Sequence, residues 1–197
     1  MGLDRSGGPP PQTRKGGPLQ PWTIPNAIGF TRILLIPLFL ALAMESGDGR
    51  EAEATIVFAV IAWSDYLDGM AARITGQYSR LGALLDPLTD RLLVIAGAIV
   101  CWEFDLLPHW ALAVLAGREA FMLVLTQLAL RRGLDLNVNM LGRWAVWPTM
   151  SAIALAMMVE TQVTNWLLYL GLAMTLAATA LYLQDGVRGL REGSSST

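Results

Sequence analysis

Six long apolar stretches separated by polar breaks constrain the fold of this chain more than any other feature. Each is close to the roughly 20 residues with which an α-helix crosses a bilayer. We therefore expect an all-α integral membrane protein with six transmembrane helices. The predicted helices cover about residues 25–44, 52–73, 82–104, 108–131, 142–159 and 164–184.

Composition agrees with a membrane protein. Of the 197 residues, 54% are apolar and 15% charged, whereas soluble domains average roughly 25% charged. A net charge of -2 gives no reason to expect a nucleic-acid partner. Residues 1–22 are rich in Gly and Pro, and we interpret them as a disordered tail before a membrane domain at 23–186. Residues 187–197 are interpreted as a C-terminal tail.

The basic residues predict the orientation of the helices, because cytoplasmic loops are rich in Lys and Arg. Ten basic residues lie in the two tails and in the loops after the second and fourth stretches. The three alternate loops hold Arg50 alone, beside several acidic residues. Both termini should therefore be cytoplasmic, and we expect the bacterial inner membrane as the location.

Four aspartates occur where a membrane protein least tolerates them, at Asp65, Asp68, Asp86 and Asp90. A lone carboxylate inside a bilayer costs roughly 2.5–3.5 kcal/mol on insertion scales. The loop between the second and third stretches is predicted to be cytoplasmic, so these carboxylates should lie in the cytoplasmic half of the membrane. Four such groups together require a counter-charge, and metal is the obvious candidate.

Helical spacing allows the aspartates to act together. At about 100° per residue, Asp65 and Asp68 share one helix face, and Asp86 and Asp90 share a narrow stripe on the next helix. Oxygen ligands without Cys or His favour Mg²⁺ or Mn²⁺. Two such ions would clamp a phosphate or pyrophosphate and stabilise in-line displacement. A cation transporter with an acidic intramembrane site is the alternative from a different functional class.

The complete pattern is Asp65-x2-Asp68-Gly69-x2-Ala72-Arg73-x8-Gly82-x3-Asp86-x3-Asp90, and it resembles the signature of the CDP-alcohol phosphatidyltransferases. The resemblance implies a membrane enzyme, commonly dimeric, with its active site open to the cytoplasmic leaflet. It implies that Asp65, Asp68 and Asp86 bind two divalent metals and that Asp90 completes the site as general base. Gly69, Ala72 and Arg73 would form the pocket for the CDP part, and Gly82 would leave room for the ligand.

The acceptor alcohol is suggested by secondary features. Thr23-Ile24-Pro25-Asn26 followed by Arg32 resembles the opening of the phosphatidylglycerophosphate and cardiolipin synthase subgroup, as does Pro87 after the third aspartate. We therefore expect transfer from CDP-diacylglycerol to sn-glycerol 3-phosphate, with release of CMP. A cardiolipin synthase using phosphatidylglycerol is the second hypothesis, and a phosphatidylinositol phosphate synthase is the third.

Arginines in apolar surroundings are candidates for holding the acceptor. Arg118 lies within the fourth stretch and Arg143 near the start of the fifth, and a guanidinium suits a phosphate. We predict that these two bind the acceptor's phosphate. The competing interpretation is a structural ion pair, either between Arg118 and Glu119 or between Arg91 and an aspartate.

Overall fold

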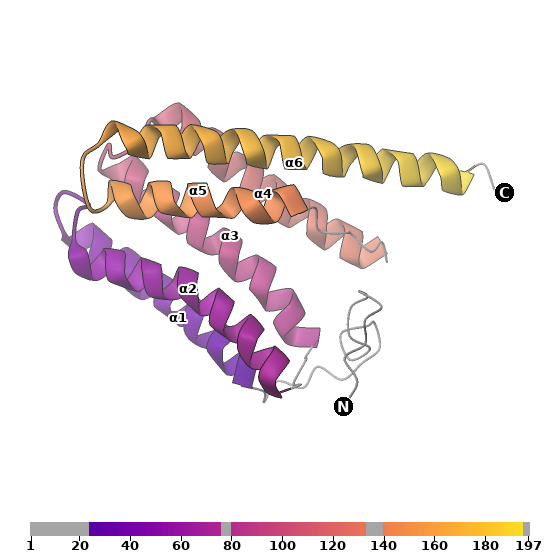
Figure 1. The fold of residues 1–197 in the computed structure, drawn as a ribbon, viewed down its shortest axis with the longest axis horizontal. Helices are drawn as coiled ribbons and strands as arrows, with labels where there is room; N and C mark the ends of the chain where they lie inside the picture. The colour runs from indigo at the N-terminus through magenta and orange to yellow at the C-terminus, as the bar shows by residue number, and fades with distance from the viewer. Residues whose placement is uncertain (1–23, 76–79, 133–139, 195–197) are drawn as a thin grey trace.

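A computed structural model describes residues 24–75, 80–132 and 140–194, with side-chain surroundings given for 26–64, 88–125 and 144–184. Within these residues the chain forms six helices and belongs to the all-α class (Figure 1). They are α1 (Ile24–Glu45), α2 (Ala52–Thr75), α3 (Arg80–Glu103), α4 (His109–Arg132), α5 (Met140–Ala156) and α6 (Gln162–Ser194). The predicted number and order of helices are confirmed.

The predicted boundaries differ most in the last two helices. α5 ends at Ala156, before the predicted end at 159, and α6 continues from the predicted end at 184 to Ser194. In the sequence the apolar run of α6 stops at Leu183, before Gln184 and Asp185. Residues 185–194 include three glycines, which disfavour a helix, but no proline, which would break it. An apolar run therefore predicts the stretch suited to lipid rather than the full length of a helix.

Helix α3 is the centre of the bundle. It contacts α1, α2, α4 and α5, while α6 packs mainly against α5. Because successive helices run in opposite directions, three connections gather at one end of the bundle, on the left in Figure 1. We call this the loop end; it comprises residues 46–51, 104–108 and 157–161.

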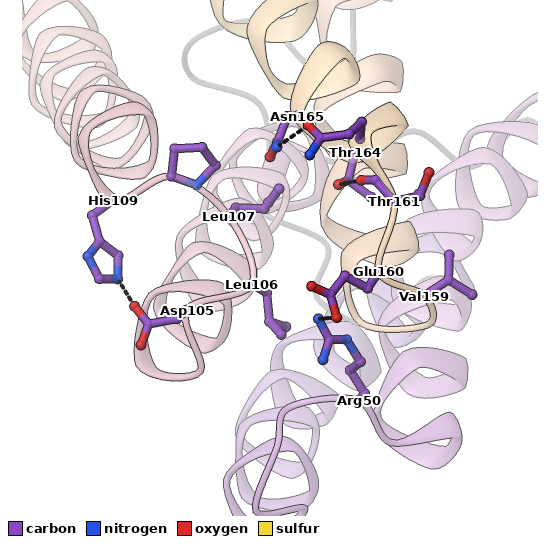
Figure 2. Close-up of a pocket in the computed structure, with 12 residues that line it drawn as sticks. Arg50, Asp105, Leu106, Leu107, His109, Val159, Glu160, Thr161, Thr164 and Asn165 are labelled. Atoms are coloured by element: carbon purple, nitrogen blue, oxygen red, sulfur yellow. Dashed lines mark hydrogen bonds and ion pairs between the residues drawn. The ribbon is translucent and has the colours of Figure 1, made fainter.

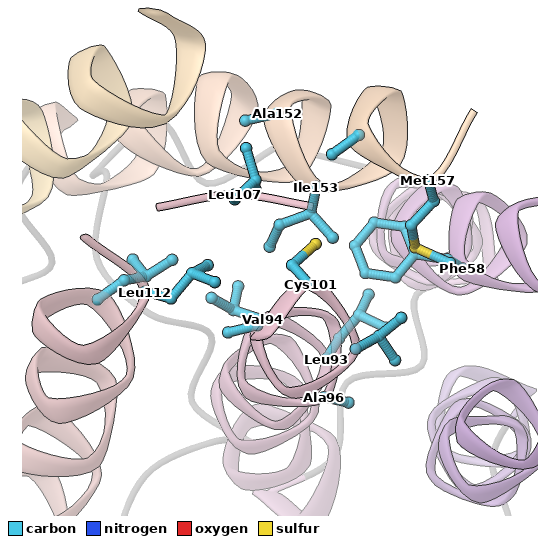
Figure 3. Packing of buried hydrophobic residues seen from close by; sticks show 14 of the residues in the cluster. Phe58, Leu93, Val94, Ala96, Cys101, Leu107, Leu112, Ala152, Ile153 and Met157 are labelled. Atoms are coloured by element: carbon cyan, nitrogen blue, oxygen red, sulfur yellow. The ribbon is translucent and has the colours of Figure 1, made fainter. Parts of the chain in front are cut away.

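Among the described side chains, a hydrophobic core lies near the loop end. Figure 3 shows Phe58, Leu93, Cys101 and Ile153 meeting there from α2, α3 and α5. Cys101 is fully buried and is part of this core. Gly97 also belongs to this region, because a Cβ on it would approach Ile153 Cγ2 to 2.7 Å. Close helix contact at small residues is typical of bundles in lipid.

The outside of the bundle is apolar. All six helices expose large hydrophobic side chains, including Leu34 at 74% and Trp166 at 71% exposure. Within the described residues, two stretches, Asn26–Glu45 and Gln162–Gln184, are long and apolar enough to cross a membrane. An apolar surface of this extent suits lipid better than water. That all six helices cross stays a prediction.

Tight turns close the loop end. Gly49 in the α1–α2 connection has φ of 70°, and a Cβ there would lie 2.6 Å from the Phe104 ring. Ser46 Oγ accepts a hydrogen bond from the Gly49 amide at 2.8 Å. A glycine is therefore required at position 49 by both backbone conformation and space.

Candidate functional site

Helices α2 and α3 place the four aspartates at matching depths. The two helices run antiparallel and contact each other (Figure 1). Asp65 is ten residues before the end of α2 and Asp90 is ten residues after the start of α3, which puts each about 15 Å from the helix end. Asp68 and Asp86 are seven and six residues from those ends, about 10 Å. The backbone therefore brings the four positions to two shared levels.

The remaining signature residues lie on the same two helices, toward the ends joined by residues 76–79. Gly69, Ala72 and Arg73 are in the last turns of α2, and Gly82 is in the first turn of α3. Arg143 lies in the first turn of α5. The side chains of these residues, and those of Asp65, Asp68 and Asp86, lie outside the described part of the chain.

Asp90 is the signature aspartate whose side chain is described, and it is bound by an arginine from another helix. Arg32 Nη2 on α1 donates a hydrogen bond to Asp90 Oδ1 at 2.5 Å. The arginine side chain is 1% exposed and the aspartate 33% exposed. Sequence reasoning noted both residues but did not pair them. A pairing of Arg32 with an acidic residue could have been predicted from the sequence, because charged groups inside a membrane pair with one another.

Arg118 on α4 is fixed by two partners. Its Nη1 donates to Glu119 Oε1 at 2.5 Å, and its Nε donates to Thr179 Oγ1 of α6 at 2.9 Å. Thr179 in turn donates to the Thr175 carbonyl at 2.8 Å. The predicted structural pair of Arg118 with Glu119 is therefore present. The role of Thr179 was missed, because a threonine in an apolar helix gives no signal of its partner.

Arg91 shares the same carboxylate. Its Nε lies 4.0 Å from Glu119 Oε2, so the partner is a glutamate of α4 rather than the aspartate that the sequence suggested. Arg91 Nη1 is buried and makes no hydrogen bond within the described residues. A buried N–H donor without an acceptor costs about 1–3 kcal/mol.

These contacts form two neighbouring groups, the pair Arg32–Asp90 and the group Arg91–Glu119–Arg118, which adjoin on α3 because Asp90 directly precedes Arg91. We call them together the charged cluster. Among the described side chains, Arg32 and Asp90 balance each other while two guanidiniums share the carboxylate of Glu119, so the cluster carries one excess positive charge. Such an arrangement in low-dielectric surroundings attracts an anion.

A cavity of about 540 Å³ lies at the loop end, far from the signature positions. Figure 2 shows Arg50 and Glu160 on one side of it and Asp105 and His109 on another. The Arg50–Glu160 ion pair measures 3.7 Å and the His109–Asp105 contact 3.0 Å. Arg50 is half-buried, and the other three side chains are exposed. The rings of His109 and Trp102 stack with their centroids 4.3 Å apart. A tryptophan at this end of the bundle is typical of a membrane interface. The described residues contain no group of three or more potential metal ligands, here or elsewhere.

Comparison with known proteins identifies the family. The pattern of the family described as CDP-alcohol phosphatidyltransferase matches residues 22–177. A relative from Streptomyces coelicolor named cardiolipin synthase (CMP-forming) is 36% identical over 84% of this chain and 80% of its own length. Relatives named CDP-diacylglycerol--glycerol-3-phosphate 3-phosphatidyltransferase occur in Bacillus subtilis and Pseudomonas fluorescens. The Bacillus subtilis protein is 31% identical over 68% of this chain and 75% of its own length. The Pseudomonas fluorescens protein is 32% identical over 85% of this chain and 88% of its own length. With four-fifths of its length matched and the aspartates at the spacing described above, the chain belongs to the CDP-alcohol phosphatidyltransferase family.

Proposed function

We propose that this protein transfers the phosphatidyl group of CDP-diacylglycerol to sn-glycerol 3-phosphate and releases CMP. The observation that carries the proposal is the set of four carboxylates at matching depths on α2 and α3, within a chain of this family. Relatives named for this reaction align along most of the chain. The excess positive charge of the charged cluster supports an acceptor that itself carries a phosphate.

We place the bundle across the bacterial inner membrane with all six helices spanning it. The apolar exterior supports this arrangement. The loop end holds Arg50 among several acidic residues, so the rule for basic loops assigns it to the outer side. Both termini and the α2–α3 connection are then cytoplasmic, and the active site opens toward the cytoplasm. A homodimer is the assembly expected for the family.

Asp65, Asp68, Asp86 and Asp90 would hold two Mg²⁺ or Mn²⁺ ions. The donor set fits such ions, because hard divalent cations prefer carboxylate oxygens and these four residues share two depths on adjacent helices. When bound, the ions would neutralise charge on the pyrophosphate of CDP-diacylglycerol and make CMP a better leaving group.

The residues of the chain supply positioning and proton transfer. Gly69, Ala72, Arg73 and Gly82 form the pocket for the CDP part. The acceptor hydroxyl oxygen attacks the phosphorus that bears the lipid, and the bond from that phosphorus to the CMP oxygen breaks. Asp90 takes the hydroxyl proton as the new bond forms. No nucleophilic Ser or Cys is needed, because orientation and electrostatic stabilisation provide the catalysis.

Arg118 and Arg143 bind the phosphate of the acceptor. In Arg118, Nε and Nη1 already donate to Thr179 and Glu119, which fixes the plane of the guanidinium. Within the described residues Nη2 makes no hydrogen bond, so this edge is the part suited to a phosphate oxygen.

A cardiolipin synthase is the second candidate, favoured by the 36% identity to the Streptomyces coelicolor protein of that name. That enzyme class uses phosphatidylglycerol, whose phosphodiester carries one negative charge. The phosphate monoester of glycerol 3-phosphate carries nearly two negative charges and is therefore attracted more strongly by the charged cluster. Phosphatidylinositol phosphate synthesis is the third candidate.

A CMP-release assay on the purified protein tests the choice. CDP-diacylglycerol and Mg²⁺ or Mn²⁺ are supplied with glycerol 3-phosphate, phosphatidylglycerol or inositol phosphate in separate reactions, and the lipid product is identified by mass. We expect release with glycerol 3-phosphate and formation of phosphatidylglycerophosphate. Release with phosphatidylglycerol alone would make the protein a cardiolipin synthase, and no release with any acceptor would refute the proposal.

The role of Arg118 has its own test. Because a hydrogen bond to a charged group contributes about 1.5–3 kcal/mol, Arg118→Ala should raise the KM for glycerol 3-phosphate roughly ten- to a hundredfold. The KM for CDP-diacylglycerol should stay within about twofold. Equal increases in both values would show that Arg118 supports the fold of the site rather than the acceptor.

A further inference from the structure

Arg32 and Asp90 form an ion pair that is buried on one side only. The guanidinium on α1 is 1% exposed, whereas the carboxylate on α3 is 33% exposed. The arginine therefore lies behind the aspartate, enclosed by the bundle, and the aspartate faces the accessible space.

A buried guanidinium is costly, so its presence on an otherwise apolar helix needs a reason. α1 has a mean hydropathy of 2.1 over Asn26–Glu45, and a leucine would satisfy packing at position 32 at lower cost. The planar fork of arginine offers something that leucine or lysine cannot, namely a fixed direction for a carboxylate oxygen. At 2.5 Å, the charge-assisted bond to Oδ1 holds one oxygen of Asp90 in place.

We propose that Arg32 is a positioning residue for Asp90. It sets the orientation of the carboxylate that takes the acceptor's proton, and it does not itself contact either substrate. The inference rests on the proposed role of Asp90 in phosphatidyl transfer. It extends a general rule of active sites, in which a supporting group locks the rotamer of the reacting one.

The two substitutions Arg32→Met and Arg32→Lys test this role in the full-length protein in detergent or lipid nanodiscs. Methionine keeps the length of the side chain but removes the charge, and lysine keeps the charge but removes the fork. We expect kcat for CMP release to fall at least about tenfold in Arg32→Met and less in Arg32→Lys, with KM for both substrates within about twofold. Arg50→Met at the loop end is the control and should match the wild type, because that arginine pairs with an exposed glutamate.

A second measurement, independent of activity, follows the pair itself. Asp90→Leu removes a carboxylate partner from the buried guanidinium and should lower the apparent Tm more than Arg32→Met, which leaves a partly exposed carboxylate that water can solvate. The double variant Arg32→Met/Asp90→Leu should recover most of that loss. Additive losses would mean that the two residues do not act as a pair.

The outcomes separate this inference from the proposed function. A wild-type protein without CMP release refutes the function, while the Tm cycle still reports on the pair. Wild-type kcat in Arg32→Met, or a raised KM at unchanged kcat, overturns the positioning role. If Arg32→Met does not fold, Arg32→Lys decides: reduced kcat at wild-type Tm supports the role, and unchanged kcat overturns it.

Discussion

Two described regions of the bundle are held together by different forces. The region next to the loop end is dry, with Phe39, Phe58, Ile153 and Leu168 fully or almost fully buried and glycines at the closest helix contacts. Further from the loop end, the described interior also contains the charged cluster, from Arg32 on α1 to Arg118 on α4. Both regions are buried, but only burial of the charged cluster costs free energy of desolvation.

The first region positions the helices, and the second lies at the proposed active site. Apolar packing near the loop end involves no desolvation of charge and can fix the relative positions of six helices. Buried ion pairs roughly break even against hydrophobic residues of the same shape, so they contribute little to stability for their cost. Their position at and next to Asp90 supports the proposed role of the charged cluster in catalysis rather than a role in folding.

The largest expected effect is on activity. Asp86→Asn should reduce CMP release by at least about a hundredfold, because it removes one of the charges proposed to hold the metal ions. The protein should remain folded, since removing one of four clustered carboxylates relieves repulsion. Activity is followed by CMP release and folding by size-exclusion chromatography. Retained activity would contradict the metal assignment.

Glu119→Gln tests the cost of the charged cluster. The carboxylate is 7% exposed and faces both Arg91 and Arg118, so its neutralisation leaves two guanidiniums without the charge they share. We expect a loss of about 3 kcal/mol in the free energy of unfolding. Reversible unfolding in mixed detergent micelles measures this value. A loss below about 1 kcal/mol would mean that the arginines are adequately solvated.

Gly171→Ala tests how closely the helices pack in the apolar region near the loop end. A Cβ on Gly171 of α6 would lie 2.3 Å from Thr149 Oγ1 and 2.9 Å from the Thr149 backbone nitrogen of α5. The helices must separate, at a cost of about 1–3 kcal/mol. Gly117→Ala is the matched control, because a Cβ there meets nothing within 4 Å among the described residues and should stabilise α4 by about 0.5–1 kcal/mol. Equal effects of the two substitutions would show that α5 and α6 are not in close contact.

The smallest effect is expected at the loop end. Glu160→Gln removes the partner of Arg50, but Glu160 is 88% exposed and the pair measures 3.7 Å. The change in unfolding free energy should be within about 0.5 kcal/mol, with unchanged CMP release. A loss of unfolding free energy as large as that of Glu119→Gln would show that exposed and buried ion pairs contribute equally to the stability of this protein.

Periodic and compositional signals predicted much of this protein. The six apolar stretches predicted six helices, because a helix crossing lipid needs a continuous run of suitable side chains. The spacing of the aspartates predicted the family, which the match over residues 22–177 established. These features are local: each is contained within one helix or one pair of consecutive helices.

What only the tertiary structure decided is which charges meet. Arg32 and Asp90 are 58 residues apart and Arg118 and Thr179 are 61 apart, and no spacing in the sequence joins them. Arg91 could have faced an aspartate or a glutamate, and the packing of α3 against α4 selected Glu119. The sequence by itself determined the helices and the carboxylates they carry. The partners of the buried arginines were decided by helix packing, because a charge inside an apolar bundle pairs with whichever opposite charge the neighbouring helices bring within reach.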